Sequence, residues 1–323
     1  MASTSQRLLG AAVMAVAVAG QAAEVREQAI VLDTAGGAIA GTLALPDTKT
    51  KPLVVLIIAG SGPTDRDGNN SLAGRNDSLK LLAAALAEGG VASVRYDKRG
   101  IGASRAAAPS EAALRFDTYV DDAAAWVAKL QADARFAAPV LLGHSEGALI
   151  ATVAARRGGA AALVSVAGVA RRPGAILRTQ LAGKLPPDLA AANERILAGL
   201  EQGATTQDVP PALAAFYRPS VQPYLISWMQ YDPAAQLAAL KLPTLIVQGT
   251  TDIQVGAGEA SALKAARPDA VLALVPGMNH VLKAVPADPQ KQLASYADPA
   301  LPLAPQLAGI ILDFLRGLPA AQR

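Results

Sequence analysis

Cysteine is absent from this 323-residue chain, and histidine occurs only twice. The lack of thiols excludes disulfides, a thiolate nucleophile, cysteine-ligated zinc and lipidation of a signal-peptide cysteine. The presence of only two histidines, without any cysteine, argues against a catalytic zinc site. We therefore expect no metal centre, and any nucleophile must come from another residue type.

Aromatic residues are also scarce, at 4% of the chain, and the formal net charge is only +3. The lysines and arginines form no basic stripe, so we expect no nucleic-acid partner. No glycine-rich segment has the third glycine of a dinucleotide loop or the GK[ST] of a phosphate loop, and we expect no cofactor. The 52% hydrophobic residues fit one large α/β domain with an insertion.

One apolar run has the features of a targeting signal. It begins at Leu8, directly after Arg7, and is followed by the small residue Ala22. This order is typical of a signal peptide cleaved after Ala22 or Ala23, and the run is too short to span a bilayer comfortably. We predict that residues 1–22 are a signal peptide and that the mature protein is periplasmic or secreted, without a membrane span. An uncleaved anchoring helix is the alternative.

Strand-like and helix-like segments alternate along the rest of the chain, which predicts an α/β fold with a mostly parallel central sheet and helices on both faces. The expected strands are 29–34, 38–45, 52–59, 91–96, 138–142, 161–167, 243–249 and 270–275, and the expected helices are 77–87, 116–130, 148–155, 256–266 and 305–315. The alternation stops at residues 171–240, which are helical in pattern without a convincing strand. We predict that they form an inserted cap between core segments 23–170 and 241–323. The sequence carries no signal for an oligomeric state.

Residues 143–147, Gly-His-Ser-Glu-Gly, have the pattern GxSxG between a predicted strand and a predicted helix. In a nucleophile elbow, the two glycines relieve crowding around a strained serine whose hydroxyl points out above the sheet. The pattern also occurs by chance in ordinary turns, but its flanking segments are those that an elbow requires. We therefore predict Ser145 as a nucleophile.

A serine nucleophile needs a base and an acid that orients the base. His144 adjoins the serine, so we expect its side chain to point away from the hydroxyl and to be a packing residue. His280, in a loop after a predicted strand, is then the base. Among several acidic residues between Ser145 and His280, Asp252 is favoured because it follows a buried strand at its carboxyl end, where the active-site loops of open α/β sheets gather. A solvated turn residue is the alternative.

The oxygen that becomes negatively charged during acyl transfer needs two N–H donors. One is expected from Glu146, the residue after the nucleophile. The other is expected from the glycine-rich loop after the third strand, where the position favours Ser61 and leaves Gly62 as the alternative.

The order Ser145, Asp252, His280, downstream of a glycine-rich loop, resembles the α/β-hydrolase superfamily over nearly the whole mature chain. Segments 60–69 (GSGPTDRDGN) and 96–104 (YDKRGIGAS) strengthen this resemblance. Together with GHSEG they resemble a branch of bacterial carboxylesterases near the serine aminopeptidase-like and dienelactone-hydrolase-like groups. The resemblance implies an α/β-hydrolase fold with an inserted helical cap.

The same resemblance implies a cofactor-free serine hydrolase that cleaves small-molecule carboxylic esters through an acyl-enzyme. A serine peptidase, an aminopeptidase-like amidase or an acyltransferase would use the same residues, and a non-catalytic binding scaffold is a further alternative. One departure from the pattern of common lipases is Ala59-Gly60 in place of His-Gly in the oxyanion loop. That change leaves the backbone donors available.

Two further clusters suggest binding sites. Asp65, Asp67 and Asn69 have the spacing of a calcium loop, but the sixth and twelfth positions are Asn70 and Asn76 rather than glycine and glutamate, so we expect a hydrogen-bonded loop instead. In the predicted cap, five aromatic residues crowd into one stretch and line either a substrate pocket or the core of the cap itself. They are Phe216, Tyr217, Tyr224, Trp228 and Tyr231.

Overall fold

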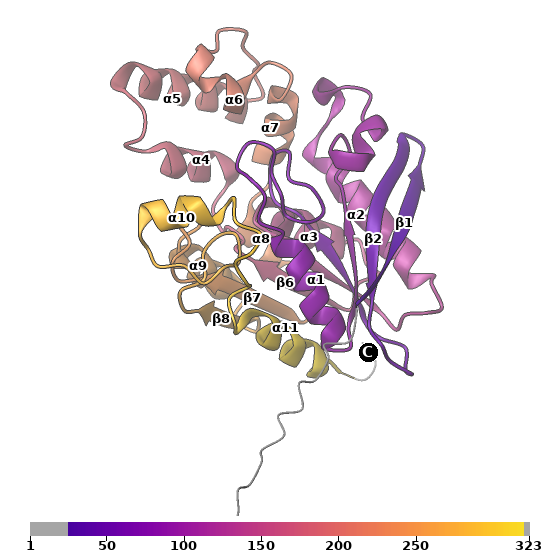
Figure 1. The fold of residues 1–323 in the computed structure, drawn as a ribbon. Helices are drawn as coiled ribbons and strands as arrows, with labels where there is room; N and C mark the ends of the chain where they lie inside the picture. The colour runs from indigo at the N-terminus through magenta and orange to yellow at the C-terminus, as the bar shows by residue number, and fades with distance from the viewer. Residues whose placement is uncertain (1–24, 320–323) are drawn as a thin grey trace, which may run out of the picture.

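The centre of the molecule is one open sheet of eight strands, seen in Figure 1. The computed structural model describes residues 25–319, so the predicted signal peptide lies outside the described residues. In spatial order the strands are β1 (Arg26–Thr34), β2 (Gly37–Leu45), β4 (Ala92–Tyr96), β3 (Val54–Ile58), β5 (Pro139–His144), β6 (Ala162–Val166), β7 (Thr244–Gly249) and β8 (Val271–Val275).

The eight predicted strands are all present, with ends that differ by a few residues. β1 and β2 form an antiparallel hairpin, and β2 is antiparallel to β4. The remaining neighbours, from β4 through β3 and β5 to β8, are parallel. The prediction of a mostly parallel sheet is therefore confirmed, and the carboxyl ends of its parallel strands meet at one edge.

Helices connect the strands and account for most of the remaining regular structure. They are α1 (Ser78–Glu88), α2 (Phe116–Gln131), α3 (Glu146–Ala155), α4 (Pro173–Leu181), α5 (Pro187–Glu201), α6 (Ala214–Tyr217), α7 (Gln222–Met229), α8 (Pro233–Ala238), α9 (Ala257–Ala266), α10 (Pro289–Ser295) and α11 (Leu307–Arg316), with short 3-10 segments at Gly102–Ala107, Glu111–Ala113 and Pro211–Leu213. The sequence pattern did not predict α10, because a helix of two turns is too short to show a period. Within the described part of the chain, no helix has both the length and the apolarity needed to cross a membrane.

The buried strands place alternate side chains on the two faces of the sheet. In β3, Val54, Leu56 and Ile58 join the core that includes residues of α2 and α3, whereas Val55 and Ile57 join the core of α1 and α11. This arrangement explains why the strand is a continuous apolar run: both of its faces are covered by helices. Figure 1 shows α1 and α11 together in front of the sheet.

Between β6 and β7 the chain forms helices α4 to α8, and no strand is described in this interval. Helices α4 to α7 gather at the top of the view in Figure 1, apart from the sheet. Helix α8 differs from them because it packs against α3 and α9. The division of the chain into core segments and a cap at residues 171–240 stays a prediction.

Candidate active site

The turn between β5 and α3 holds Ser145 in a strained conformation. Its φ is 56° and its ψ is −122°, a region that residues with a side chain rarely adopt. A Cβ on Gly143 would lie 2.0 Å from the carbonyl oxygen of Gly147, and one on Gly147 would lie 2.3 Å from that of Ile58. The two glycines of the GxSxG pattern are therefore required by close backbone contact, and the serine between them is the only residue of this turn that is not buried.

His280 follows β8, and Asp252 follows the neighbouring strand β7. Nδ1 of His280 lies 2.8 Å from Oδ2 of Asp252, and both side chains are nearly inaccessible to solvent. Because an ionised carboxylate can only accept, Nδ1 carries the proton and donates it. This tautomer leaves Nε2 of His280 as a proton acceptor.

The carboxylate of Asp252 is fixed by several donors besides His280. Its Oδ1 accepts hydrogen bonds from the backbone N–H groups of Gln254 at 2.8 Å and Val255 at 2.9 Å, and Gln248 Nε2 lies 3.2 Å from Oδ2. Burial alone would raise the pKa of Asp252, but His280 and the two backbone N–H groups outweigh it and lower the pKa below its usual value of 3.8. Asp252 is therefore an ionised, oriented acceptor for His280 at neutral pH.

His144 has a more specific contact than the packing role predicted for it. Its Nε2 lies 2.8 Å from the carbonyl oxygen of His280, and the centroids of the two imidazole rings are 4.9 Å apart. Burial, followed by the proximity of His280, lowers the pKa of His144 to about 3, so the ring is neutral and donates its Nε2–H. His144 thus holds the backbone of the loop that carries His280.

The loop after β3 brings the predicted oxyanion donors beside the serine. A Cβ on Gly60 would lie 3.2 Å from the Cβ of Ser145, a tight contact that the glycine avoids, so the loop lies directly beside the serine. Gly62 has a φ of +67° and turns the chain away after Ser61. The backbone N–H of Glu146 lies in the first turn of α3, where it has no intrahelical acceptor. The geometry retains both Ser61 and Gly62 as candidates for the second donor.

A cavity of about 960 Å³ opens in front of these groups and is lined by Ser145, His280, Ser61, Gly62 and Glu146. Four of the five cap aromatics also line it: Phe216, Tyr217, Tyr224 and Trp228. Tyr231 differs from the prediction, because its hydroxyl binds Asp117 and its ring lies 4.9 Å from that of Phe116 on α2. All of these aromatics except Phe216 also belong to the hydrophobic core or pack against it, so the two interpretations of this cluster both apply.

The chain is similar to several known proteins. A family model described as serine aminopeptidase, S33, matches residues 70–218, a stretch that contains Ser145 but ends before Asp252. Esterase EstD from Thermotoga maritima is 27% identical over 215 residues, which make up 67% of this chain and 50% of EstD. The chain therefore matches only about half the length of that curated relative.

Solved structures extend the likeness to most of the chain. Est1E from Butyrivibrio proteoclasticus, with ferulic acid bound, has a TM-score of 0.61 at 19% identity and covers 89% of this chain and 99% of its own. The alpha/beta hydrolase GrgF from Penicillium sp. sh18 has a TM-score of 0.59 at 17% identity, with 91% and 99% covered. The chain has the α/β-hydrolase fold. The fold predicted from the sequence is therefore confirmed.

Three residues of the candidate site were not assigned a role from the sequence alone, or were assigned a different one. The side chain of Lys98, just after β4, is buried beside that of Glu146, with Nζ 3.3 Å from Oε2. Tyr224 of α7 donates to the other oxygen, Oε1, at 2.7 Å. The only sequence signal for Lys98 was a lysine two residues after a fully buried strand. Glu146, expected to matter through its backbone, also has its carboxylate in a buried ion pair.

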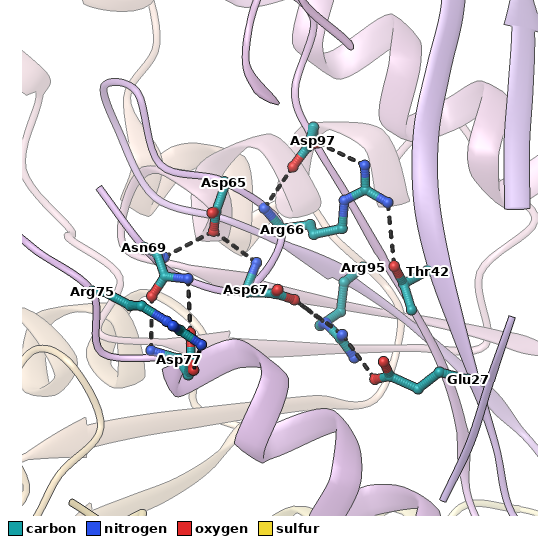
Figure 2. A network of polar contacts seen from close by, with 10 residues as sticks. All are labelled: Glu27, Thr42, Asp65, Arg66, Asp67, Asn69, Arg75, Asp77, Arg95 and Asp97. Atoms are coloured by element: carbon teal, nitrogen blue, oxygen red, sulfur yellow. Dashed lines mark hydrogen bonds and ion pairs between the residues drawn. The ribbon is translucent and has the colours of Figure 1, made fainter. Parts of the chain in front are cut away.

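The segment that follows the oxyanion loop is held by its own side chains, as Figure 2 shows. Oδ1 of Asp65 accepts the backbone N–H groups of Asp67 and Asn69, both at 2.9 Å. Oδ1 of Asn69 in turn accepts those of Asn76 at 2.9 Å and Asp77 at 2.8 Å. These side-chain oxygens are engaged within the protein, and residues 25–319 contain no group of three or more histidine or acidic side chains that could hold a metal ion.

Ion pairs tie the same segment to the sheet (Figure 2). Arg66 donates to Asp97 at 2.7 Å, and Asp97 lies directly after β4. Arg95 of β4 is 1% exposed and pairs with Asp67 at 3.0 Å and with Glu27 of β1 at 2.9 Å. The loop that begins with the oxyanion residues is therefore anchored to the antiparallel part of the sheet.

Proposed function

We propose that this protein is a serine hydrolase that cleaves carboxylic esters through an acyl-enzyme. The single observation that carries the proposal is that the strained Ser145 shares one cavity with His280, whose Nδ1 is held by Asp252 at 2.8 Å. The esterase relative supports an ester hydrolase, while the roles of the individual residues and the covalent intermediate are our inference.

In the proposed reaction, Oγ of Ser145 attacks the ester carbonyl carbon while Nε2 of His280 takes the hydroxyl proton. The N–H groups of Glu146 and of Ser61 or Gly62 stabilise the negative oxygen of the tetrahedral intermediate. As that intermediate collapses, the ester C–O bond breaks, and His280 gives its proton to the departing alcohol. Water, deprotonated by the same histidine, then attacks the acyl-enzyme and releases the acid.

The charges in the cavity favour esters over substrates of an aminopeptidase. An aminopeptidase must hold the protonated α-amino group of its substrate, which requires a carboxylate that is free inside the site. Among the described residues, the carboxylates that line the cavity are Glu111 and Glu146. Glu111 is bound by Arg218, and Glu146 is bound by Lys98 and Tyr224. Neither is left to bind an amine.

We also propose that the enzyme acts after export, as a periplasmic or secreted protein, with residues 1–22 removed as a signal peptide. In the same proposal, residues 171–240 form a cap over the cavity, which would restrict the acyl or alcohol part of the substrate. The aromatic side chains of α6 and α7 support this assignment because they line the cavity.

The proposal is tested by replacing Ser145 with alanine. The purified variant should lose hydrolysis of p-nitrophenyl acetate and covalent labelling by a fluorophosphonate. Ser110, a second serine that lines the cavity, provides the matched control, because Ser110→Ala should keep both activities. Retained hydrolysis in Ser145→Ala, or labelling that follows Ser110, contradicts the proposal.

A further inference from the structure

One buried ammonium contacts both halves of the candidate oxyanion hole. The side chains of Lys98 and Glu146 are 1% and 3% exposed, and they form an ion pair in the wall of the cavity. Nζ of Lys98 also donates a hydrogen bond to the carbonyl oxygen of Gly60, and it lies 5.1 Å from the centroid of the Tyr119 ring. A buried charge of this kind is retained only where carboxylate and dipole partners replace its hydration.

The contact with Gly60 orients the next N–H group. The carbonyl of Gly60 and the N–H of Ser61 belong to the same planar peptide unit, which is trans. In a trans peptide these two bonds point in opposite directions. By holding the carbonyl oxygen on one side, Lys98 directs the N–H of Ser61 to the other side, away from its own ammonium group. Ser61 lines the same cavity as Ser145.

The contact with Glu146 reaches the second donor. Glu146 contributes its backbone N–H at the start of α3, and its carboxylate is held from two sides, by Lys98 at 3.3 Å and by the hydroxyl of Tyr224 at 2.7 Å. Tyr224 belongs to α7, and its ring packs 5.5 Å from that of Tyr119. A shift of α7 would therefore move a partner of the carboxylate that sits beside the nucleophile.

We propose that Lys98, Glu146 and Tyr224 form a buried relay that aligns the two oxyanion donors and couples them to the position of α7. The inference rests on the proposed function, since it assigns a role in that same reaction. Lys98 is a positioning residue in this relay: it does not contact the substrate oxygen, but it holds the peptide that does. Loss of the relay should weaken binding of the tetrahedral intermediate more than binding of the ester.

The main test removes the ion pair as a unit, so that no buried charge is left unpaired. We expect Lys98→Met/Glu146→Gln to lower kcat about 10- to 100-fold, with KM changed by less than about threefold, because donors are misaligned rather than lost. Affinity for a boronic acid that forms a tetrahedral adduct with Ser145 should fall by the same factor as kcat. Each activity is divided by the concentration of active serine, which is measured by letting the fluorophosphonate react to completion.

The neighbouring buried pair supplies a matched control. Arg99 pairs with Asp122 and donates to the carbonyl oxygen of Ala107 at 2.8 Å, so it has the same kinds of partner as Lys98 but lies outside the cavity lining. Arg99→Met/Asp122→Asn should shift the unfolding temperature without lowering kcat per titrated serine. Equal kcat values for the two double variants would overturn the proposal.

A pair of tyrosines provides a milder test if the double variant does not fold. Tyr224→Phe and Tyr231→Phe each delete one hydroxyl that binds a carboxylate, Glu146 in one case and Asp117 in the other. Only Tyr224→Phe should reduce kcat, by about three- to tenfold. Its affinity for the boronic acid should fall by the same factor as its kcat. Unchanged kcat in Tyr224→Phe overturns the relay. If Ser145→Ala stays active, the proposed function itself fails, whatever these variants do.

Discussion

Replacement of Asp252 by asparagine should place a hydrogen-bond donor where His280 needs an acceptor. Oδ1 of Asp252 accepts the N–H groups of Gln254 and Val255, so the amide oxygen of the asparagine must take that place. Its NH₂ group then occupies the site of Oδ2 and faces Nδ1 of His280. His280 can accept this bond only by moving its proton to Nε2, the atom that has to take the proton of Ser145.

The expected loss follows from this change of tautomer. We expect kcat to fall by about 10³- to 10⁴-fold, as when the acid of a catalytic triad is made an amide, with KM little changed. That factor corresponds to about 4–5.5 kcal/mol of transition-state stabilisation. Stability should also decrease by about 1–3 kcal/mol, because Gln248 Nε2, 3.2 Å from Oδ2, would face a second donor in a buried position.

The assay is hydrolysis of p-nitrophenyl acetate, with the active serine titrated by a fluorophosphonate and folding checked by thermal unfolding. Asp288→Asn is the matched control: Asp288 also accepts a backbone N–H, from Lys291 at 2.9 Å, but lies outside the cavity lining. It should keep full activity. A loss of less than tenfold in folded Asp252→Asn would refute the assignment of Asp252 as the residue that orients His280.

Two predictions concern stability. Gly147→Ala should destabilise the fold by about 3 kcal/mol or more, since the new Cβ would lie 2.3 Å from a carbonyl oxygen. Gly258 is the second residue of α9, as Gly147 is of α3, but a Cβ there would have no atom within 4 Å. Gly258→Ala should therefore stabilise the fold by about 0.5–1 kcal/mol. Equal urea midpoints for the two variants would contradict this. Burial raises the pKa of Asp97, but Arg66 and the backbone N–H of Ala103 outweigh burial and lower the pKa below 3.8. The ionised carboxylate therefore stabilises the fold above about pH 4. This contribution to stability is lost as the pH falls through the pKa of the folded state. Asp97→Asn should therefore lower the free energy of unfolding at pH 7 and flatten its decline in acid, and an unchanged acid slope in urea titrations would show the assignment to be wrong.

The strands of the parallel sheet were predictable because their information is local. Every residue of β3, β5 and β7 is buried, and a strand covered on both faces has a mostly apolar sequence, which in β3 is uninterrupted. Helix α10 was missed because it spans only seven residues and begins at a proline, so its sequence has the composition of a loop.

The same contrast holds at the candidate site. The place of Ser145 in a strained turn was predictable because an elbow is a five-residue motif between a strand and a helix. That Asp252 and His280 lie together was predictable from the rule that loops meet at the carboxyl ends of parallel strands. Their roles in catalysis stay a prediction. The contact of His144 was not predictable, because its bond to the carbonyl of His280 joins residues 136 positions apart.

By itself, then, the sequence determined the elements of the sheet, the elbow and the positions of three polar residues at the strand ends, since each depends on local periodicity or on a short motif. Only the tertiary structure decided which buried charges meet. Lys98 and Tyr224 are 48 and 78 positions from Glu146, and nothing in their local sequence indicates that they share its carboxylate. Packing of α7 against α2 brings Tyr224 to the pair of Lys98 and Glu146. These buried charges are stable only because their partners are in contact with them.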